Sequence, residues 1–549
     1  MSKNNRGTVR AAVSGPVISE QRPSAATALG APGYARDLQS ELFLLAACNL
    51  PGEKAFHEGT DARVLRFRDL VRDAACAEPA WTGALLGWLR GPGNLRLAPV
   101  EAAAEYAWAR RGEAKLPPGP TVRQVVGSVL QRADEPGEII AYWLSRYGRR
   151  MPIGFKRGVA DAVLRLYTER ALLKYDTREA AVRFCDVIEM VQPRYVGDVY
   201  GTWRDALYRH AIERRHDRGN DVPESLPMIR ANQALRVRAA EDMSVLLDAN
   251  ALEAAGITWE DALSLAGSKL PKGDLWAALI PSMGYMALLR NLRNFDEAGV
   301  PDDVSETVAA RLSDPGQVAK SRQFPFRFLS AYRAVPSLRW SYPLDKALNA
   351  SLSNIPALNG RTLVLVDRSP SMWEQAFSEH SDMPWADAAA LFGAAVAVRA
   401  DHADLVEFWG HSKAVPLKAG ESVLKLTERF SYRPAPGGTD IPSAVRAHLR
   451  PDHTRVVIVT DEQTQPGYLP SNMHRGHGGM PPTLIDELIP RHVPLYMWNF
   501  GGYKNGSAPS GSGNRHTLGG LTDNAFRLIP LLEAGRDAHW DDLFATSAD

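Results

Sequence analysis

Residues 363–373 read "LVLVDRSPSMW", and this stretch decides the fold of the C-terminal part of the chain. It opens with four apolar residues in a row, which is typical of a strand buried on both faces. The run stops at Asp367, and two hydroxyl side chains, Ser369 and Ser371, follow at alternate positions. One interpretation is a turn that begins at Asp367, with Ser369 capping the next helix. The other is a ligand site at the end of a buried strand.

Three further apolar runs follow this strand, and helical patterns lie between them. The runs are "ADLVEFWG" (403–410), "HTRVVIVTD" (453–461) and "VPLYMWNF" (493–500), and the helical patterns are "WADAAALFGAAVAVRA" (385–400) and "TDIPSAVRAHLR" (439–450). Near-continuous apolar strands that alternate with helices predict a parallel sheet covered on both faces. We therefore expect residues 361–549 to form a doubly wound α/β domain.

Oxygen-bearing side chains are expected to meet at one edge of this sheet. In doubly wound folds, ligands bind at the carboxyl ends of the strands, near the point where the strand order reverses. The residues that the pattern brings there are Asp367, Ser369, Ser371, Thr439 and Asp461. A set of hydroxyls and carboxylates without His or Cys suits Mg²⁺ or Mn²⁺ better than zinc. The sequence therefore predicts a divalent-cation site.

Hydrolytic alternatives have less support in the sequence. Ser369 stands where a phosphatase of the haloacid type would need a second carboxylate, and the chain has no G-x-S-x-G, G-x-x-x-x-G-K-[ST] or H-E-x-x-H motif. We expect the protein not to be an enzyme. The tract "NMHRGHGGMPP" (472–482), with His474 and His477, is interpreted as a solvated loop, with a soft-metal site as the alternative.

The five oxygen-bearing residues resemble the metal-ion-dependent adhesion site (MIDAS) of von Willebrand factor A domains. The resemblance covers residues 361–549 and is complete at all five positions. It implies that Ser369, Ser371 and Thr439 coordinate the cation directly and that Asp367 and Asp461 bind it mainly through water. It also implies an open coordination position that accepts a carboxylate from a partner protein.

The preceding part of the chain has a different texture. Residues 35–360 show short amphipathic helical patterns separated by Pro- and Gly-containing breaks such as "KLPPGP" (115–120). This texture predicts an array of helical repeats. Residues 1–34, which are rich in Ser, Ala, Pro and Gly, predict a flexible tail. We thus expect three parts, 1–34, 35–360 and 361–549.

Charge divides unevenly along the chain. Residues 361–549 hold 17 basic and 22 acidic residues, a net charge of −5, whereas residues 1–360 hold 47 basic and 41 acidic residues, a net charge of +6. Residues 320–340 combine five basic residues with five aromatic ones and no acidic residue. Such stretches bind phosphates and unpaired bases, but the same pattern also describes a helix with an aromatic core face and a solvated arginine face. Composition leaves both interpretations open.

Cysteine content and hydropathy place the protein in the cell. Three widely spaced cysteines do not form a disulfide framework. The N-terminal residues have no apolar stretch of signal-peptide length, and no apolar run approaches the length of a membrane span. We expect a soluble, cytoplasmic protein without membrane contact.

Several segments, taken in order, resemble the TROVE module fused to a von Willebrand A domain, as in the Ro autoantigen family. The segments are "SELFLLAACNLPGEKAFHE" (40–58), "MPIGFKRGVADAVLRLYTERALLKYD" (151–176), "GDLWAALIPSMGYMALLRNLRNFDEAGV" (273–300), "QFPFRFLSAYRAV" (323–335) and "LNGRTLVLVDRSPSMW" (358–373). The resemblance implies a monomeric ring of HEAT-like repeats closed by the A domain. It also implies binding of noncoding Y-like RNA and of single-stranded 3′ ends of misfolded RNA, in RNA quality control, maturation or decay. An exoribonuclease such as polynucleotide phosphorylase is the implied protein partner.

Candidate RNA-binding residues follow from the resemblance and from the basic stretches. The resemblance carries the role over to Lys156, Arg157 and Lys174, and the further basic candidates are Arg149, Arg150, Arg290, Arg293, Arg322 and Arg327. The sequence departs from the family pattern in "FCDVIEMVQPR" (184–194), where Phe184 and Gln192 stand in place of histidines. Family-like Y RNA contacts are therefore not predicted at those two positions. The alternative function is a metal-dependent protein-interaction adaptor that binds no RNA.

Overall fold

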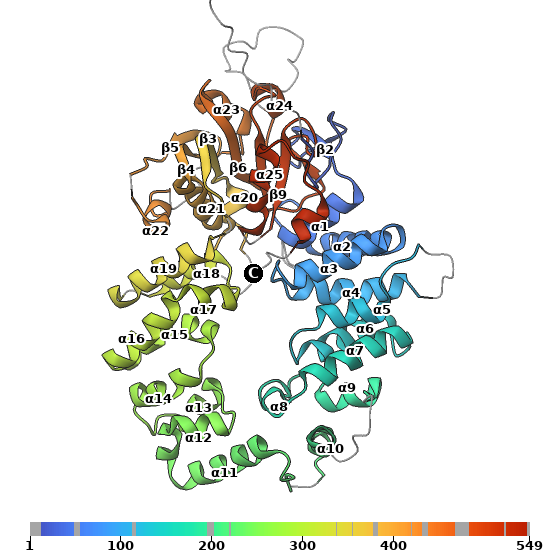
Figure 1. Ribbon diagram of the computed structural model, residues 1–549, viewed down its shortest axis with the longest axis vertical. Coiled ribbons are helices and arrows are strands. Elements are labelled where there is room, and N and C mark those ends of the chain that lie inside the picture. Colours follow the sequence, from blue (N-terminus) through green and yellow to red (C-terminus); the bar gives the residue numbers. More distant parts are fainter. Residues whose placement is uncertain are drawn as a thin grey trace, which may run out of the picture.

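A computed structural model gives the structure of the chain. It describes residues 13–48, 55–111, 117–194, 202–218, 221–335, 337–353, 355–376, 383–418, 420–430, 437–466, 483–520 and 523–545. Two helical arms leave an α/β domain and meet again at the opposite end of the molecule, so that the elements form an elongated ring (Figure 1).

The first arm runs from the α/β domain to the far end of the ring. Its helices are α1 (Leu38–Cys48), α2 (Thr60–Ala77), α3 (Pro79–Arg90), α4 (Leu97–Ala109), α5 (Val122–Val129), α6 (Glu135–Tyr147), α7 (Ile153–Leu166), α8 (Glu169–Tyr175), α9 (Phe184–Val191) and α10 (Trp203–Arg215). Local signals set several of their starts. Thr121 and Gln124 form a capping box at α5, and the Thr168 side chain accepts a hydrogen bond from Ala171 N at the start of α8.

The second arm returns to the α/β domain. Its helices are α11 (Pro227–Glu241), α12 (Ala249–Ala254), α13 (Trp259–Ala266), α14 (Lys272–Leu279), α15 (Tyr285–Ala298), α16 (Asp302–Ser313), α17 (Pro315–Ser321), α18 (Pro325–Ala334) and α19 (Ser341–Ser351). The arms are joined near the far end, where Ile229 N at the start of α11 donates to the Glu169 carboxylate of α8 at 2.9 Å. They also touch beside the α/β domain, where the Asn94 amide donates to the carbonyl of Arg322.

The α/β domain is built on a six-stranded sheet in the order β5-β4-β3-β6-β7-β9. All pairs are parallel except β4 with β5. Its elements are β3 (Leu358–Asp367), α20 (Pro370–Trp373), α21 (Trp385–Arg399), β4 (Ala400–Phe408), β5 (Ser412–Ala414), α22 (Val423–Thr427), α23 (Ile441–His448), β6 (His453–Thr460), α24 (Ile485–Leu488), β7 (Leu495–Asn499), β8 (Asn505–Gly506), β9 (Arg515–Gly519), α25 (Leu528–Glu533) and α26 (Trp540–Phe544). The predicted doubly wound fold is confirmed, as is the helical array.

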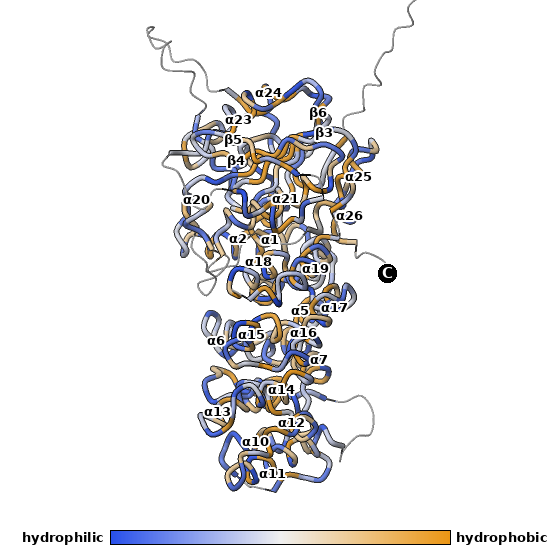
Figure 2. The backbone as a smooth tube through the Cα atoms, turned by 90° about the vertical axis from the view of Figure 1, so that its left-hand side faces the viewer, coloured by the Kyte–Doolittle hydropathy of each residue, from blue (hydrophilic) through white to orange (hydrophobic). Residues whose placement is uncertain are grey.

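Alternate residues of the central strands face two different cores. Leu363 and Leu365 of β3 pack in a cluster with α23 and α24, whereas Val364 and Val366 join the larger core that includes α21 and continues into the helical arms. Hydrophobic residues accordingly concentrate inside the α/β domain, while apolar and polar residues mix along the arms (Figure 2). Because both faces of the sheet are covered, the central strands contain the apolar runs from which the sequence predicts them.

The N-terminal segment differs from the predicted flexible tail. From residue 13 onward it lies against the α/β domain, and β2 (Pro32–Ala35) pairs antiparallel with β8. Arg36 donates to the Tyr503 carbonyl at 2.6 Å and forms a buried ion pair with Glu462. The segment is held by backbone pairing, by Arg36 and by side-chain hydrogen bonds such as that from the Thr27 hydroxyl to the Thr464 carbonyl at 2.7 Å, none of which composition reveals. The short strand β1 (Ala25–Ala26) adds to β2 from its other side.

Two further sequence features can be read from the described residues. Cys48, Cys76 and Cys185 are all free thiols. Within the described part of the chain, the helices are too short or too polar to cross a membrane. The predicted domain boundaries remain a prediction; β3 itself begins at Leu358.

Candidate functional site

The candidate cation site lies where the strand order reverses. β3 pairs with β4 on one side and with β6 on the other, so the carboxyl ends of β3 and β6 flank the switch point. The register sets Val366 opposite Val459, and Asp367 and Asp461 end or follow these two neighbouring strands. Both aspartates are completely buried. The sheet thus brings together two carboxylates that are far apart in sequence.

Short hydrogen bonds fix the Asp367 side chain. Its Oδ1 accepts from the backbone N–H of Ser369 at 2.8 Å, and its Oδ2 accepts from the Thr460 hydroxyl at 2.6 Å. The hydroxyl oxygens of Ser369 and Ser371 lie 3.2 Å apart. The turn at Asp367 is present and α20 begins right after Ser369, but the Ser369 side chain accepts no capping hydrogen bond. They also hold the two hydroxyls beside the carboxylate.

Asp461 has an unused ligand atom. Its Oδ1 accepts from Gln463 N at 3.0 Å, while its Oδ2 is buried and has no hydrogen-bond partner among the described residues. A buried carboxylate oxygen without a partner is costly unless a cation or donor binds it.

Thr439 is tied to the loop that follows Asp461. Its carbonyl accepts from Gln465 N and from the Thr464 hydroxyl, both at 2.9 Å. Thr439 is almost fully buried, at 1% exposure, and it precedes Asp440, the N-cap residue of α23. The structure therefore brings all five predicted residues to the same edge of the sheet.

Two buried carboxylates at this edge of the sheet make a bound positive charge favourable. Burial, and then the charge of Asp461, raise the pKa of Asp367 to about 7. Burial also raises the pKa of Asp461, although the Gln463 amide and the Ser371 hydroxyl partly oppose this. Two buried carboxylates that repel each other favour a divalent cation between them. With its all-oxygen donors and its unpartnered Oδ2, this set fits a hard cation such as Mg²⁺.

Two neighbours of Asp461 were missed by sequence reasoning. Burial lowers the pKa of His57, and the charge of Asp461 opposes this effect, so the two side chains share one neighbourhood. Nε2 of His57 is buried without a hydrogen-bond partner among the described residues. The Tyr503 hydroxyl accepts from His57 N at 3.3 Å. His57 comes from the first helical arm, and only the folded ring brings it here, so no local signal could have found it.

Two of the predicted RNA-binding residues share one cavity. Lys156 and Arg157 of α7 line a surface cavity of ≈ 400 Å³, together with Arg123, Arg194 and Gln192. Its walls come from α5, α7 and the end of α9. Arg123 also pairs with Asp161, another lining residue, through bonds of 2.6 and 2.8 Å. The remaining basic side chains give the cavity a net positive lining.

Lys174 lies in a different place. It lines a separate cavity of ≈ 360 Å³ between α6, α8 and the start of α9, in which Asp134 and Glu138 are also found. The structure therefore does not bring Lys174 together with Lys156 and Arg157. Two carboxylates in the same lining make this cavity a weaker attractor for phosphate.

The remaining candidates are spread over the ring. Arg149 and Arg150 are exposed in the turn between α6 and α7, and Arg293 of α15 is exposed but paired with Glu297 at 2.7 Å. Arg290 and Arg327 are close enough that the charge of Arg290 adds to burial in lowering the pKa of Arg327. Arg322 is exposed at the end of α17.

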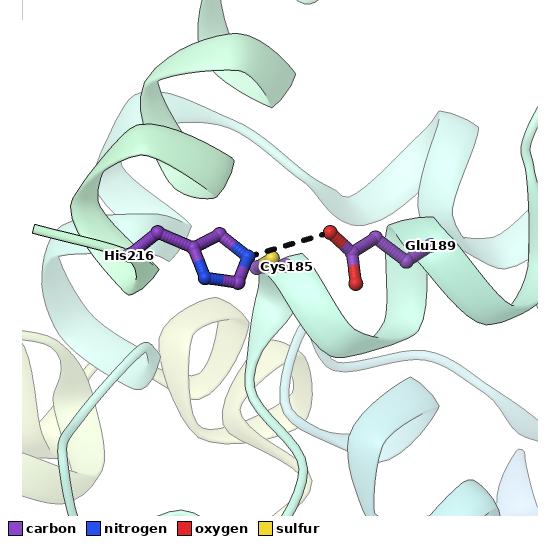
Figure 3. Close-up of side chains that lie close together, drawn as sticks. All are labelled: Cys185, Glu189 and His216. Atoms are coloured by element: carbon purple, nitrogen blue, oxygen red, sulfur yellow. Dashed lines mark ion pairs between the residues drawn. The ribbon is translucent and has the colours of Figure 1, made fainter. Parts of the chain in front are cut away.

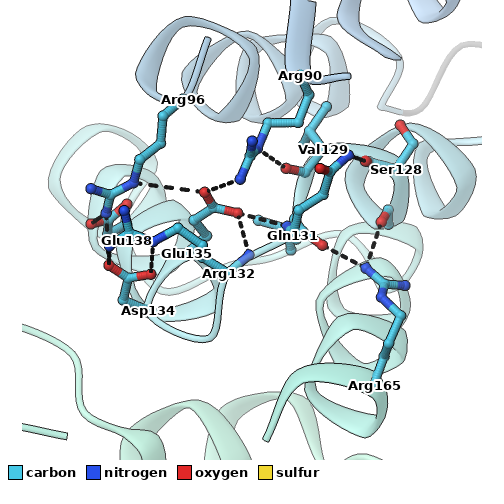
Figure 4. Close-up of polar contacts among 12 residues, drawn as sticks. Arg90, Arg96, Ser128, Val129, Gln131, Arg132, Asp134, Glu135, Glu138 and Arg165 are labelled. Atoms are coloured by element: carbon cyan, nitrogen blue, oxygen red, sulfur yellow. Dashed lines mark hydrogen bonds and ion pairs between the residues drawn. The ribbon is translucent and has the colours of Figure 1, made fainter. Parts of the chain in front are cut away.

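Several arginines that contribute to the basic composition have structural roles instead. Arg90 donates to the buried carboxylate of Glu135 at 2.6 Å and to the carbonyl of Val129 at 3.0 Å. Arg165 donates to backbone carbonyls at the end of α5 (Figure 4). The number of basic residues therefore overstates the positive charge that is available to bind a polyanion. The tract with His474 and His477 lies outside the described residues.

Known proteins match the chain in sequence and in fold. The TROVE domain family model matches residues 253–391. Over 83 residues the chain is 42% identical to telomerase protein component 1 of Mus musculus and 41% identical to that of Rattus norvegicus. Each match covers 15% of this chain but only 3% of the relative, so the chain spans a small fraction of these relatives.

The fold comparison covers nearly the whole chain. The crystal structure of the Deinococcus radiodurans RO (RSR) protein matches with a TM-score of 0.59 at 16% identity, over 89% of this chain and 99% of that chain. At this sequence identity the match shows similarity of fold only. It confirms the architecture that the motif order predicts: residues 253–391 match the TROVE domain family model, and the chain has the fold of the RO (RSR) protein, a helical ring closed by an α/β domain.

Proposed function

We propose that the protein is a noncatalytic RNA-binding ring scaffold. In this proposal it holds structured noncoding, Y-like RNA and single-stranded 3′ ends of RNA during quality control, maturation or decay. The observation that carries the proposal is the basic cavity of Lys156, Arg157 and Arg194, in a chain with a TROVE domain and the fold of a Ro protein. A cytoplasmic, monomeric protein is part of the same proposal.

The cavity has the features that a phosphate backbone needs. Its basic side chains come from two helices and the end of a third, so that neighbouring phosphates of one strand can be neutralised together. Apolar side chains of Ile153 and Leu164 also line it. Such contacts favour RNA of many sequences, because they read charge and shape rather than base edges.

The cation edge supports a second role within the same scaffold. Asp367, Ser369, Ser371, Thr439 and Asp461 are the residues that would hold Mg²⁺ or Mn²⁺. A bound cation would supply an open coordination position for a carboxylate of a protein partner, and an exoribonuclease such as polynucleotide phosphorylase is the partner we propose.

A metal-dependent adaptor without RNA binding is the second candidate. The observation that favours it is the buried carboxylate pair with an unpartnered oxygen, which is a more completely built site than the basic cavity. The two candidates differ in whether the cavity binds RNA, and that difference can be measured.

The experiment is a salt titration of RNA affinity. A Lys156→Ala/Arg157→Ala double variant of the full chain is titrated with a single-stranded 3′-tailed RNA at several salt concentrations. We expect weaker binding and a slope of log affinity against log salt that is flatter by about 1.4, since each lost single-strand contact removes about 0.7. Lys269→Ala/Lys272→Ala, which removes the same charge from exposed sites outside the cavity, is the matched control. If the RNA affinity and the salt slope of the cavity variant equal those of the control variant, the metal-dependent adaptor without RNA binding is favoured.

A further inference from the structure

Three side chains with metal-binding atoms meet between α9 and α10. The ligand atoms of Cys185, Glu189 and His216 all lie within 4.8 Å of one another (Figure 3). Across the described residues, this is the one group of three or more His, Cys, Asp or Glu side chains with such spacing. It lies in the helical arm, away from the cation edge of the α/β domain.

The local structure explains why these three side chains meet. Cys185 and Glu189 are four residues apart on α9, so they lie on the same face of the helix, one turn apart. His216 caps the carboxyl end of α10, where its backbone N–H donates to the carbonyls of Ile212 and Glu213. Its ring therefore projects from a fixed point toward the face of α9 that carries the other two.

Other interactions explain the cluster poorly. Nε2 of His216 lies 3.6 Å from Oε1 of Glu189, which is longer than a hydrogen bond, and both side chains are substantially exposed. The neighbouring Arg215 pairs with Asp186 instead of with Glu189. An exposed ion pair of this length contributes little to stability. The Cys185 thiol donates a hydrogen bond to the Glu189 carboxylate one turn along α9, but this contact does not involve His216.

We propose that Cys185, Glu189 and His216 bind a divalent cation of the zinc type, with water as the fourth ligand. A thiolate, an imidazole and a carboxylate form a donor set that zinc accepts in tetrahedral geometry. With metal–ligand distances of about 2.0–2.3 Å, the ligand atoms would lie about 3.3–3.8 Å apart. Small rotations of the exposed Glu189 and His216 side chains provide this contraction.

The chemistry of the site separates it from the cation edge of the sheet. Sulfur and nitrogen donors favour zinc over Mg²⁺, whereas the five residues at the sheet edge offer oxygen only. Burial and the adjacent Glu189 raise the pKa of the Cys185 thiol to about 12, so without a metal the thiol keeps its proton. Binding exchanges this proton for the cation, because a coordinated thiol is deprotonated.

The bound metal would join α9, which lines the basic cavity, to the neighbouring helix α10. α9 supplies Met190 and Val191 to the lining of that cavity, and its first turns carry Cys185 and Glu189. A metal shared with His216 fixes α9 to the end of α10. The expected role is therefore structural: the cation holds one wall of the cavity in place.

The test uses cobalt as a spectroscopic substitute for zinc in the full-length protein. Co²⁺ bound to a thiolate gives a charge-transfer absorption that oxygen and histidine ligands do not give. The chain has three cysteines, and the His474–His477 tract and the sheet edge contribute none. Excess Mg²⁺ in the sample occupies the oxygen site. We expect the charge-transfer band in the wild-type chain, and competition by Zn²⁺ should abolish it.

The variants assign the band to its residues. Cys185→Ser should remove it, while Cys76→Ser, at a partly buried thiol on α2, should retain it. His216→Ala changes an exposed residue and provides a folded variant even where Cys185→Ser fails to fold; its Co²⁺ affinity should fall at least about tenfold. No band in the wild-type chain, a band that survives in Cys185→Ser, or an unchanged affinity in His216→Ala would each overturn the proposal.

Discussion

At the scale of single residues, the position of one carboxylate explains most of the chemistry at the sheet edge. Asp367 ends the strand that the sequence marks most clearly, and its oxygens are held by Ser369 N and the Thr460 hydroxyl. The five candidate ligands could be predicted because each follows a strand or opens a helix in a regular α/β pattern. The position of His57 beside Asp461 could not be predicted, because the residues around His57 in the sequence carry no motif that indicates this contact.

Asp367→Asn tests the electrostatics of this edge. In the folded chain the pKa of Asp367 is raised from 3.8 to about 7. The protonated Asp367 carboxyl therefore contributes its full stability to the folded chain below pH 3.8. This contribution is lost as the pH rises to about 7, because the carboxyl ionises at a lower pH in the unfolded chain than in the folded one. Without metal, we expect the variant to be more stable than wild type at pH 8, by on the order of 4 kcal/mol, and no more stable at pH 4.

Thermal unfolding with and without Mn²⁺ measures the effect. Mn²⁺ should raise the melting temperature of the wild-type chain at pH 8 and leave that of Asp367→Asn unchanged. Asp452→Asn, at an exposed carboxylate, is the control and should respond to Mn²⁺ like wild type. An equal Mn²⁺ response in all three proteins would place the cation elsewhere.

At the scale of elements, regular apolar patterns were readable, whereas polar strands were not. The sequence predicts β3, β4, β6 and β7, because each contains a buried apolar run. β9 reads "RHTLG" and was missed. Its Arg515 is buried, and its guanidinium donates to the carbonyls of Val493 and Ile489 at 3.0 and 2.6 Å. A strand stabilised by such tertiary hydrogen bonds carries no period in its own sequence.

The turn between α5 and α6 shows how a buried ion pair organises a helix connection. Oε1 of Glu135 accepts from Arg90, and Oε2 accepts from the backbone N–H groups of Gln131 and Arg132 at 2.6 and 2.8 Å. The Glu135 side chain is fully buried. One carboxylate thus satisfies donors from α3 and from the turn itself (Figure 4).

Glu135→Gln should loosen α5 and α6, because it leaves Arg90 buried without a counter-charge. Removal of one partner of a buried pair costs about 3–5 kcal/mol. The readout is amide hydrogen exchange of the peptides that cover α5 and α6, since a chain with several structural parts does not unfold in one step. We expect exchange at least about tenfold faster there and unchanged exchange in β3 and β6.

Glu138→Gln lies one turn further along the same helix and is the matched control. Its partner is Arg96, and the Glu138 side chain is 39% exposed, so the loss should stay below about 1 kcal/mol. If both variants exchanged at the same rate, burial of the Glu135 pair would not be the stabilising factor.

At the scale of the whole molecule, the first and the last described segments of the chain meet at one domain. Residues 13–36 lie against the α/β domain, and Trp540 of α26 packs against Phe43 of α1, with ring centroids 5.1 Å apart. The helical arms therefore begin and end on the same platform. A truncation at residue 360 would remove the surface on which α1 and β2 are held, so the two proposed functions must be separated in the full-length chain.

Removal of the metal should separate RNA binding by the helical ring from partner binding by the α/β domain. The α/β domain has a net charge of −5, which disfavours a polyanion, while residues 1–360 carry the basic excess of +6. RNA bound at Lys156 and Arg157 should therefore stay bound in EDTA, apart from small changes in ionic strength. A partner protein held through a carboxylate on the cation should be released, because Asp367 and Asp461 are left without the positive charge between them.

Gel shift and pull-down on one sample, before and after EDTA, decide this assignment. Re-addition of Mg²⁺ should restore the partner, and Asp461→Asn should mimic EDTA while its RNA affinity stays at the wild-type value. Zinc at the α9–α10 cluster is the confounding factor, because EDTA removes that metal as well. A parallel sample in excess Mg²⁺ with a zinc-selective chelator distinguishes the two metals. Loss of RNA together with retention of the partner after Mg²⁺ removal would reverse the roles of the ring and the α/β domain.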